Sequence, residues 1–143
     1  MDGFKVLLVD DEADFLDTLV KRLRKRNLDA VGAGSGEAAL GWLNQQEADV
    51  VVLDVRMPGM DGIQTLKEIK KCHPMIEVIM LTGHASLEVA IEGMEAGAFD
   101  YLMKPMNVDE LLHKLQDAYK RKMIQSEKIH RMKEMAESAE DRV

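Results

Sequence analysis

Three aspartates, a threonine and a lysine stand where short apolar segments of this sequence end. The first segment is followed by Asp10 and Asp11, the third ends at Asp54, the fourth at Thr82, and the fifth at Lys104. Three carboxylates gathered in one crevice would repel one another, and a bound cation is the usual remedy. Because Mg²⁺ prefers oxygen ligands and keeps room for waters and phosphate, these aspartates predict a magnesium site.

The lysine and the threonine add the groups that phosphoryl transfer requires. A carboxylate that attacks phosphorus needs the charge of the transferring group neutralised, and Mg²⁺ and an ammonium can both supply this. Lys104 is therefore the expected ammonium contact. Thr82 is expected to donate a hydrogen bond from its hydroxyl to a phosphoryl oxygen. Taken singly, each residue would be an ordinary cap, turn or surface residue, so the interpretation depends on their joint position.

The elements that must position these residues are five apolar runs separated by segments of helical period. Run Val50–Leu53 is apolar on both faces, as expected of a parallel strand covered by helices on both sides. Five strands alternating with five helices predict an α/β fold, a three-layer α/β/α sandwich around a parallel sheet. The other four expected strands are Phe4–Val9, Asp29–Ala33, Ile76–Leu81 and Phe99–Leu102.

Two strand orders fit this alternation, a Rossmann-type order and the flavodoxin-like order 2-1-3-4-5. Ligands of open α/β sheets bind beyond the carboxyl ends of the strands, where the topology switches direction. In the order 2-1-3-4-5 this point lies between strands 1 and 3, which would bring Asp10, Asp11 and Asp54 together. The alternation of elements alone does not choose between the two orders.

Length and composition indicate a single domain that lies in the cytoplasm. The chain has 143 residues, 46% of them hydrophobic and 31% charged, with a net charge of −7. This balance argues against general affinity for nucleic acid, and no apolar run approaches the roughly 20 residues of a membrane helix. The N-terminus lacks the features of a signal peptide, and the single cysteine, Cys72, cannot form an internal disulfide.

Four stretches of the chain carry a family resemblance. Over roughly Phe4–Tyr119 the chain resembles the receiver domain of two-component response regulators, of the kind found in chemotaxis. Each stretch alone would be weak, but together they are highly specific. They are VLLVDDE at Val6–Glu12, VLDVRMPGMDG at Val52–Gly62, LTGH at Leu81–His84 and YLMKP at Tyr101–Pro105.

The resemblance implies a sheet of order 2-1-3-4-5 and a site with defined roles. It implies that Asp54 accepts a phosphoryl group from a histidine kinase or a phosphotransfer protein. It also implies that Mg²⁺ is held by Asp10, Asp11 and Asp54 together with the backbone carbonyl of Met57, and that a cis peptide bond joins Lys104 to Pro105. A receiver of this kind is a regulatory phosphoacceptor rather than an enzyme.

The resemblance further implies a switch. In the family, a threonine moves toward the phosphoryl group and an aromatic residue of the fifth strand turns inward; here these would be Thr82 and Tyr101. The change should alter the face formed by helix 4, strand 5 and helix 5, which a partner can read. Arg56 and His84 occupy positions thought to tune the lifetime of the phosphoryl group. The alternative that both are solvent-exposed loop residues without such a role is at least equally supported.

The C-terminal part of the chain continues the fifth helix without proline or glycine. We expect a receiver domain at residues 1–120 and a helical extension or the start of a linker at residues 121–143. The extension has only an imperfect heptad pattern. A homodimer through this helix or through the face of helix 4, strand 5 and helix 5 is left open, as is a downstream protein or a fused output domain. The chain is not expected to contact membrane or nucleic acid directly.

Two alternatives of other classes compete with the receiver interpretation. A phosphatase of the haloacid-dehalogenase type also forms an aspartyl phosphate, but its nucleophile follows strand 1 in an Asp-x-Asp pattern, which this chain lacks. A flavodoxin-like cofactor binder would need a phosphate-cradling loop. The glycine-rich run Gly32–Gly36 is weak evidence for one, because no clear ribose-binding acid follows it.

Overall fold

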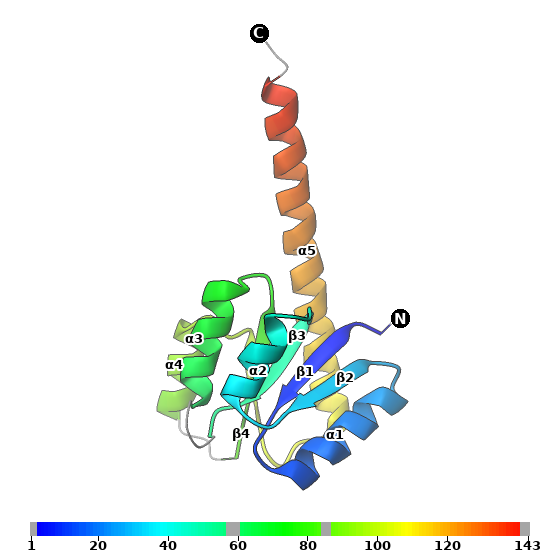
Figure 1. Ribbon diagram of the computed structural model, residues 1–143, viewed down its shortest axis with the longest axis vertical. Coiled ribbons are helices and arrows are strands. Elements are labelled where there is room, and N and C mark those ends of the chain that lie inside the picture. The colour runs from blue at the N-terminus through cyan, green and yellow to red at the C-terminus, as the bar shows by residue number, and fades with distance from the viewer. Residues whose placement is uncertain (1–2, 57–60, 84–86, 141–143) are drawn as a thin grey trace.

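The computed structural model describes residues 3–56, 61–83 and 87–140, and it forms a three-layer α/β/α sandwich with one protruding helix (Figure 1). Its five parallel strands have the order β2-β1-β3-β4-β5, which confirms the flavodoxin-like topology. The strands are β1 Lys5–Val9, β2 Asp29–Ala33, β3 Val50–Asp54, β4 Glu77–Thr82 and β5 Asp100–Met103. The helices are α1 Ala13–Lys25, α2 Gly36–Leu43, α3 Gly62–Cys72, α4 Leu87–Glu95 and α5 Val108–Glu140.

The core consists of two apolar layers, one on each face of the sheet. Successive strand residues point to opposite faces, so β1 sends Val6 and Leu8 into the layer under α1 and α5, and Leu7 and Val9 into the layer under α2 and α3. All four side chains are at most 2% exposed. This two-sided burial explains why the strand sequences are continuously apolar rather than alternating.

Helix α5 is attached to the sheet by a buried apolar stripe and by ion pairs just beyond the C-terminal end of that stripe. Leu111, Leu115 and Ala118 are fully buried against the sheet. One turn further along, the Arg121 guanidinium lies 3.3 Å from Glu77, and the Lys122 ammonium pairs with Asp49. The expected continuation of this helix is confirmed, because α5 runs unbroken to Glu140.

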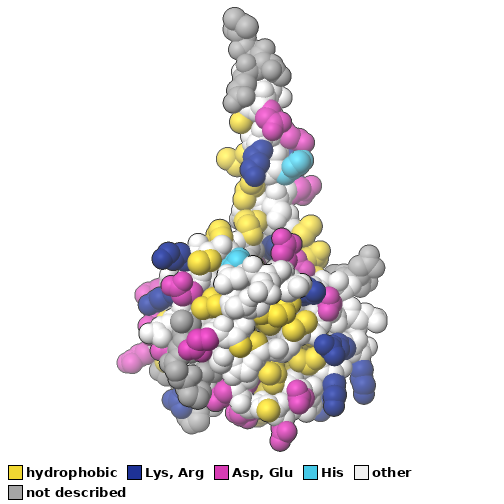
Figure 2. All heavy atoms as spheres, viewed as in Figure 1, with side chains coloured by type: hydrophobic (Ala, Val, Ile, Leu, Met, Phe, Trp, Pro, Cys, Tyr) yellow, Lys and Arg dark blue, Asp and Glu magenta, His cyan; other side chains and the backbone are white. Residues whose placement is uncertain are grey.

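Beyond Lys122, α5 projects away from the sandwich, and Figure 2 shows charged and apolar side chains mixed along this part. Its exposed apolar residues include Ile129, Met132 and Met135. Among the described residues, no helix combines the length with the apolar composition that crossing a membrane requires.

The attachment of α5 through Leu115 can be tested by truncation. Leu115→Ala should lower the free energy of unfolding by about 2 to 5 kcal/mol, because it leaves a cavity in a fully buried layer. Gln116→Ala, on the exposed side of the same turn, should change it by no more than about 0.5 kcal/mol. Urea unfolding followed by circular dichroism measures both; equal effects would show that α5 is not packed on the sheet as described.

Candidate functional site

The predicted acidic residues meet at the carboxyl ends of β1 and β3. The two strands are neighbours in parallel register, with Val9 opposite Leu53, so Asp10 and Asp54 emerge side by side. One carboxylate oxygen from each of Asp10, Asp11 and Asp54 lies within 4.8 Å of the others. Asp10 and Asp54 are 3% and 4% exposed, whereas Asp11 is open to solvent. The geometry therefore brings together the three carboxylates that the strand-end pattern selected.

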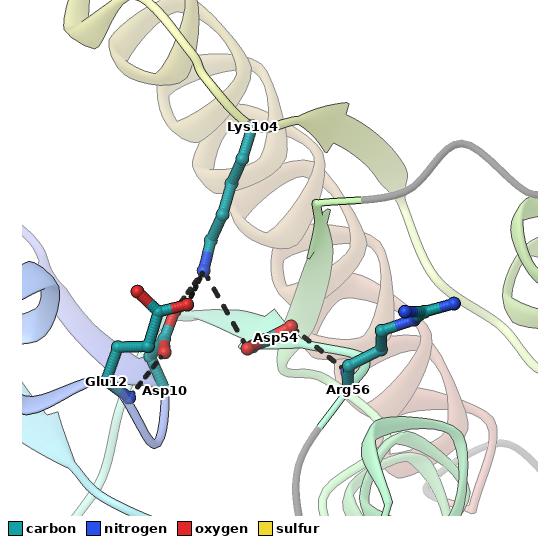
Figure 3. Close-up of polar contacts among 5 residues, drawn as sticks. All are labelled: Asp10, Glu12, Asp54, Arg56 and Lys104. Atoms are coloured by element: carbon teal, nitrogen blue, oxygen red, sulfur yellow. Dashed lines mark hydrogen bonds and ion pairs between the residues drawn. The ribbon is translucent and has the colours of Figure 1, made fainter.

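Lys104, just beyond the end of β5, reaches across the sheet edge into this cluster (Figure 3). Its Nζ lies 2.7 Å from Oδ2 of Asp10 and 3.8 Å from Oδ2 of Asp54. A third carboxylate, that of Glu12, approaches the same ammonium at 3.7 Å. The peptide bond between Lys104 and Pro105 is cis, as the resemblance implied.

The two buried carboxylates are oriented by backbone amides two residues further along the chain. The N–H of Glu12 donates to Oδ1 of Asp10 at 2.9 Å, and the N–H of Arg56 donates to Oδ1 of Asp54 at 3.0 Å. Each Oδ1 is thus fixed by the turn that follows its strand. The Oδ2 atom of each carboxylate faces Lys104. The Oδ2 atom of Asp54 is farther from the ammonium than that of Asp10, which leaves room for another group to approach it.

The electrostatics of the cluster are dominated by burial and by surplus negative charge. Burial raises the pKa of Asp54 above its ordinary value; the N–H of Arg56 and the ammonium of Lys104 act in the opposite direction, and the charges of Asp10 and Asp11 add to the rise. Burial alone would lower the pKa of Lys104, but the hydrogen bond to Asp10 and the neighbouring carboxylates raise it.

The donor set fits a divalent cation that prefers oxygen ligands. Three carboxylates converge within 4.8 Å, and the Lys104 ammonium, which contacts the buried pair, neutralises only part of their charge. Mg²⁺ is typically bound by one or two carboxylates and keeps several waters, an arrangement that a half-open cluster of this kind can accommodate.

Gly62 allows α3 to begin directly against the end of β3. A Cβ atom at this position would lie 2.3 Å from Cα of Val55 and 2.5 Å from the carbonyl oxygen of Asp54, both backbone atoms. The N–H of Gly62 donates to the carbonyl of Val55 at 3.2 Å, and Asp61 caps the helix through Gln64. The backbone that carries Asp54 therefore rests on a helix start that only glycine permits.

The remaining predicted site residues are placed around this centre or fall outside the described residues. Thr82 is buried at the end of β4, beside β3, and lines a pocket of about 360 Å³ together with Arg56. Tyr101 on β5 is 39% exposed. Met57 and His84 lie outside the described residues, so their expected roles stay predictions.

Two residues of the site were not selected from the sequence. Glu12 contributes a backbone N–H to Asp10 and a carboxylate near Lys104. Phe15 places its ring 4.2 Å from Nζ of Lys104, measured to the ring centroid. In the sequence, Phe15 is one apolar residue among several of the α1 segment, which by itself indicates only packing. Its distance from Lys104 along the chain leaves no local signal for their contact.

Comparison with known proteins identifies the family. The family model of the response regulator receiver domain matches residues 6–116. The chain belongs to this family. Receiver domains are regulatory modules of two-component systems rather than catalytic enzymes, and neither the phosphatase nor the cofactor-binding alternative finds support in the match.

Curated relatives of the receiver are much longer proteins. The transcriptional regulatory protein ZraR of Escherichia coli (strain K12) is 42% identical over 117 residues, which cover 82% of this chain and 26% of ZraR. The DNA-binding transcriptional regulator NtrC of Klebsiella pneumoniae is 42% identical over 103 residues, covering 72% of this chain and 22% of NtrC. The chain thus spans about a quarter of the length of these relatives.

Solved receiver structures match almost throughout their own length. The receiver domain of the Francisella response regulator 1452 has a TM-score of 0.78 and 36% identity, covering 83% of this chain and 98% of that one. A CheY-like receiver domain protein from Methanospirillum hungatei JF-1 has a TM-score of 0.83 and 28% identity, covering 87% and 99%. These comparisons support the receiver assignment with both sequence and structure.

The contact beneath Asp54 predicts that Gly62→Ala is costly. The added methyl group must displace backbone atoms, so we expect a loss of about 1 to 3 kcal/mol in the free energy of unfolding. The matched control is Gly41→Ala in α2, where no atom lies within 4 Å of the new Cβ, and which should gain about 0.5 to 1 kcal/mol. Chemical denaturation of both variants tests the contact; a neutral Gly62→Ala would contradict it.

The raised pKa of Asp54 predicts a pH-dependent gain in stability for Asp54→Asn. In the folded receiver, burial disfavours the ionised form of the Asp54 carboxylate, which lowers the free energy of unfolding wherever that form is populated. This loss of stability is absent below the ordinary pKa of 3.8 and develops as the pH rises through the raised pKa of the folded state. Asparagine does not ionise, so Asp54→Asn avoids this loss of stability. In EDTA, the melting temperature of Asp54→Asn should exceed that of the wild type at about pH 7, and the difference should shrink toward about pH 4. A difference that is constant with pH would contradict this origin.

Proposed function

We propose that Asp54 of this receiver accepts a phosphoryl group from a histidine kinase or a phosphotransfer protein, with Mg²⁺ held by Asp10, Asp11 and Asp54. The observation that carries the proposal is the buried pair of Asp10 and Asp54 bridged by the ammonium of Lys104. The carbonyl of Met57 is proposed as a further metal ligand on the resemblance alone.

The geometry supports Oδ2 of Asp54 as the attacking oxygen. Oδ1 is occupied by the N–H of Arg56, whereas Oδ2 lies 3.8 Å from the Lys104 ammonium. In the transfer, the new bond joins this oxygen to phosphorus. The bond from phosphorus to the donor nitrogen breaks, and its electron pair leaves with the donor. Bound Mg²⁺ would neutralise charge on the transferring group.

Lys104 and Thr82 are proposed to hold the group after it arrives. The ammonium can shift from Asp10 toward a phosphoryl oxygen on Asp54, because both carboxylates already lie within 4 Å of it. Thr82 comes from the strand next to β3, and its side chain lies one residue beyond the partner of Asp54. Arg56 and His84 are proposed to influence the lifetime of the phosphoryl group.

The output is proposed to be a change in the face formed by α4, β5 and α5. Movement of Thr82 toward the phosphoryl group would make space for the ring of Tyr101, a residue that is 39% exposed. The same face exposes an apolar set that a partner protein can bury. Its members are Leu87, Ile91, Met94 and Met103.

The setting of the receiver in its pathway is also a proposal. ZraR and NtrC are transcriptional regulators, and a chain that spans a quarter of them fits the input part of a longer regulator as well as a separate protein. We place the receiver body at residues 1–120 and the extension at residues 121–143. We propose a cytoplasmic location, with homodimerisation through the α4, β5 and α5 face or through the extension. Direct nucleic-acid binding is not expected of a chain with a net charge of −7.

Labelling with acetyl phosphate tests the phosphoacceptor directly. Wild-type protein with Mg²⁺ should gain one phosphoryl adduct by intact mass, and EDTA should abolish it because the transferring group is then not neutralised. Asp54→Asn should gain none. Asp29→Asn, which changes an exposed aspartate of β2, should label like the wild type.

Beryllofluoride, which mimics a phosphoryl group on a carboxylate, separates a failed acceptor from a short-lived product. If the wild type gains no adduct but binds beryllofluoride with Mg²⁺, hydrolysis outpaces labelling and the acceptor is retained. If it shows neither adduct nor binding, or if Asp54→Asn labels equally, Asp54 is not the acceptor.

A further inference from the structure

We propose that Phe15 is a positioning residue that holds the Lys104 ammonium in place for the phosphoryl group. This inference rests on the proposed role of Asp54 and adds a residue to it. The observation is the position of Nζ of Lys104, 4.2 Å from the centroid of the Phe15 ring. A cation this close to a ring face is attracted by the negative charge density of the face.

The location of the ring is fixed independently of the lysine. Phe15 lies in the first turn of α1, which starts three residues after Asp10, and its ring is half-buried against the apolar layer under α1 and α5. The turn itself is closed by the N–H of Leu16, which donates to the carbonyl of Glu12 at 2.9 Å. The helix backbone and the apolar layer therefore position the Phe15 ring where the flexible side chain of Lys104 can pack against it.

The groups around the Lys104 ammonium show how the Phe15 ring affects its position. Nζ is 2.7 Å from Asp10, and the carboxylates of Glu12 and Asp54 lie at 3.7 and 3.8 Å. The Lys104 side chain is only 16% exposed, whereas that of Glu12 is 68% exposed. Without the ring, the ammonium could regain water by swinging toward Glu12 and away from Asp54. An aliphatic side chain would fill the same volume without attracting the charge.

The ring contact also suits a group that must change partners. A hydrogen bond to Asp10 is directional and has to be broken before Lys104 can contact a phosphoryl oxygen on Asp54. Attraction to a ring face is far less directional, so it can persist while the N–H bonds are redirected. Phe15 thus keeps the free ammonium near its bound position, and less of its freedom is lost when the phosphoryl group arrives.

Phe15 also borders the protein surface, which decides the choice of probe. Its ring lines a shallow pocket of about 250 Å³ together with Thr18, Arg22 and Met106. A protein donor seated there would touch the ring, and a variant could then fail through lost docking. Beryllofluoride and acetyl phosphate are small enough to report on the site alone.

The test replaces the ring and then changes only its electronics. Phe15→Leu should weaken beryllofluoride binding in Mg²⁺ by about two- to tenfold, the range expected when one rotamer-rich side chain must be ordered on binding. It should slow acetyl phosphate labelling by a similar factor. Site-specific incorporation of mono-, di- and trifluorophenylalanine at position 15 should weaken binding stepwise, because fluorine depletes the ring face while shape is nearly preserved.

Phe99→Leu is the matched control. Phe99 is also half-buried and also lies beside a cation, the guanidinium of Arg121 at 5.6 Å, but at the other end of the sheet. Both leucine variants should lose stability in urea, whereas only Phe15→Leu should lose beryllofluoride affinity.

Two results would overturn the proposal, and they differ from failure of the proposed function. Equal affinity across the fluorinated series would show that the ring acts by shape alone. Unchanged affinity in Phe15→Leu would show that it does not position Lys104. If instead the wild type itself binds no beryllofluoride while remaining folded, the role of Asp54 fails, and the role of Phe15 fails with it.

Discussion

The repulsion among Asp10, Asp11 and Asp54 is the interaction on which the site depends. Parallel strands that end at the same edge force these carboxylates together, and burial denies the inner two most of the water that would otherwise screen them. The ammonium of Lys104 lies near both Asp10 and Asp54, and its one positive charge cannot neutralise the two carboxylates. The fold thus maintains a site with surplus negative charge, and a bound divalent cation would supply the positive charge that the side chains lack.

The opposite end of the same sheet handles its acidic residues differently. Asp49, Glu77 and Asp100 stand at the amino ends of β3, β4 and β5, and each is paired with a basic residue of α5. Charge is balanced there by local ion pairs, with Lys70 of α3 as a second partner of Glu77, and the pairs to α5 hold that helix against the sheet. At the carboxyl end the negative charge is left unbalanced, which is the property that the proposed phosphoryl switch would use. The basic partners are Lys114, Arg121 and Lys122.

Much of this arrangement follows from the sequence, because strand period and strand ends are local signals. The apolar runs predicted the five strands to within one residue at each end, and the polar residues after them predicted the cluster. The contacts of Phe15 and Glu12 with Lys104 were missed, since they join residues far apart in the chain. The need for glycine at Gly62 also escaped, because it arises from how closely α3 approaches the backbone of β3.

The position of Lys104 connects these observations to signalling. Its hydrogen bond to Asp10 satisfies a buried charge, so a phosphoryl group can take over the ammonium only by offering a stronger acceptor. A phosphoryl group carries more charge than a carboxylate and more acceptor oxygens, and on Asp54, the proposed acceptor, it would lie within reach of the same ammonium. The Lys104 ammonium could therefore take two positions, one bonded to Asp10 and one bonded to a phosphoryl group on Asp54. A response would spread from this change of position because Lys104 belongs to the segment that links β5 to α5. The backbone N–H of Lys104 also donates to the carbonyl oxygen of Thr82 at 2.7 Å.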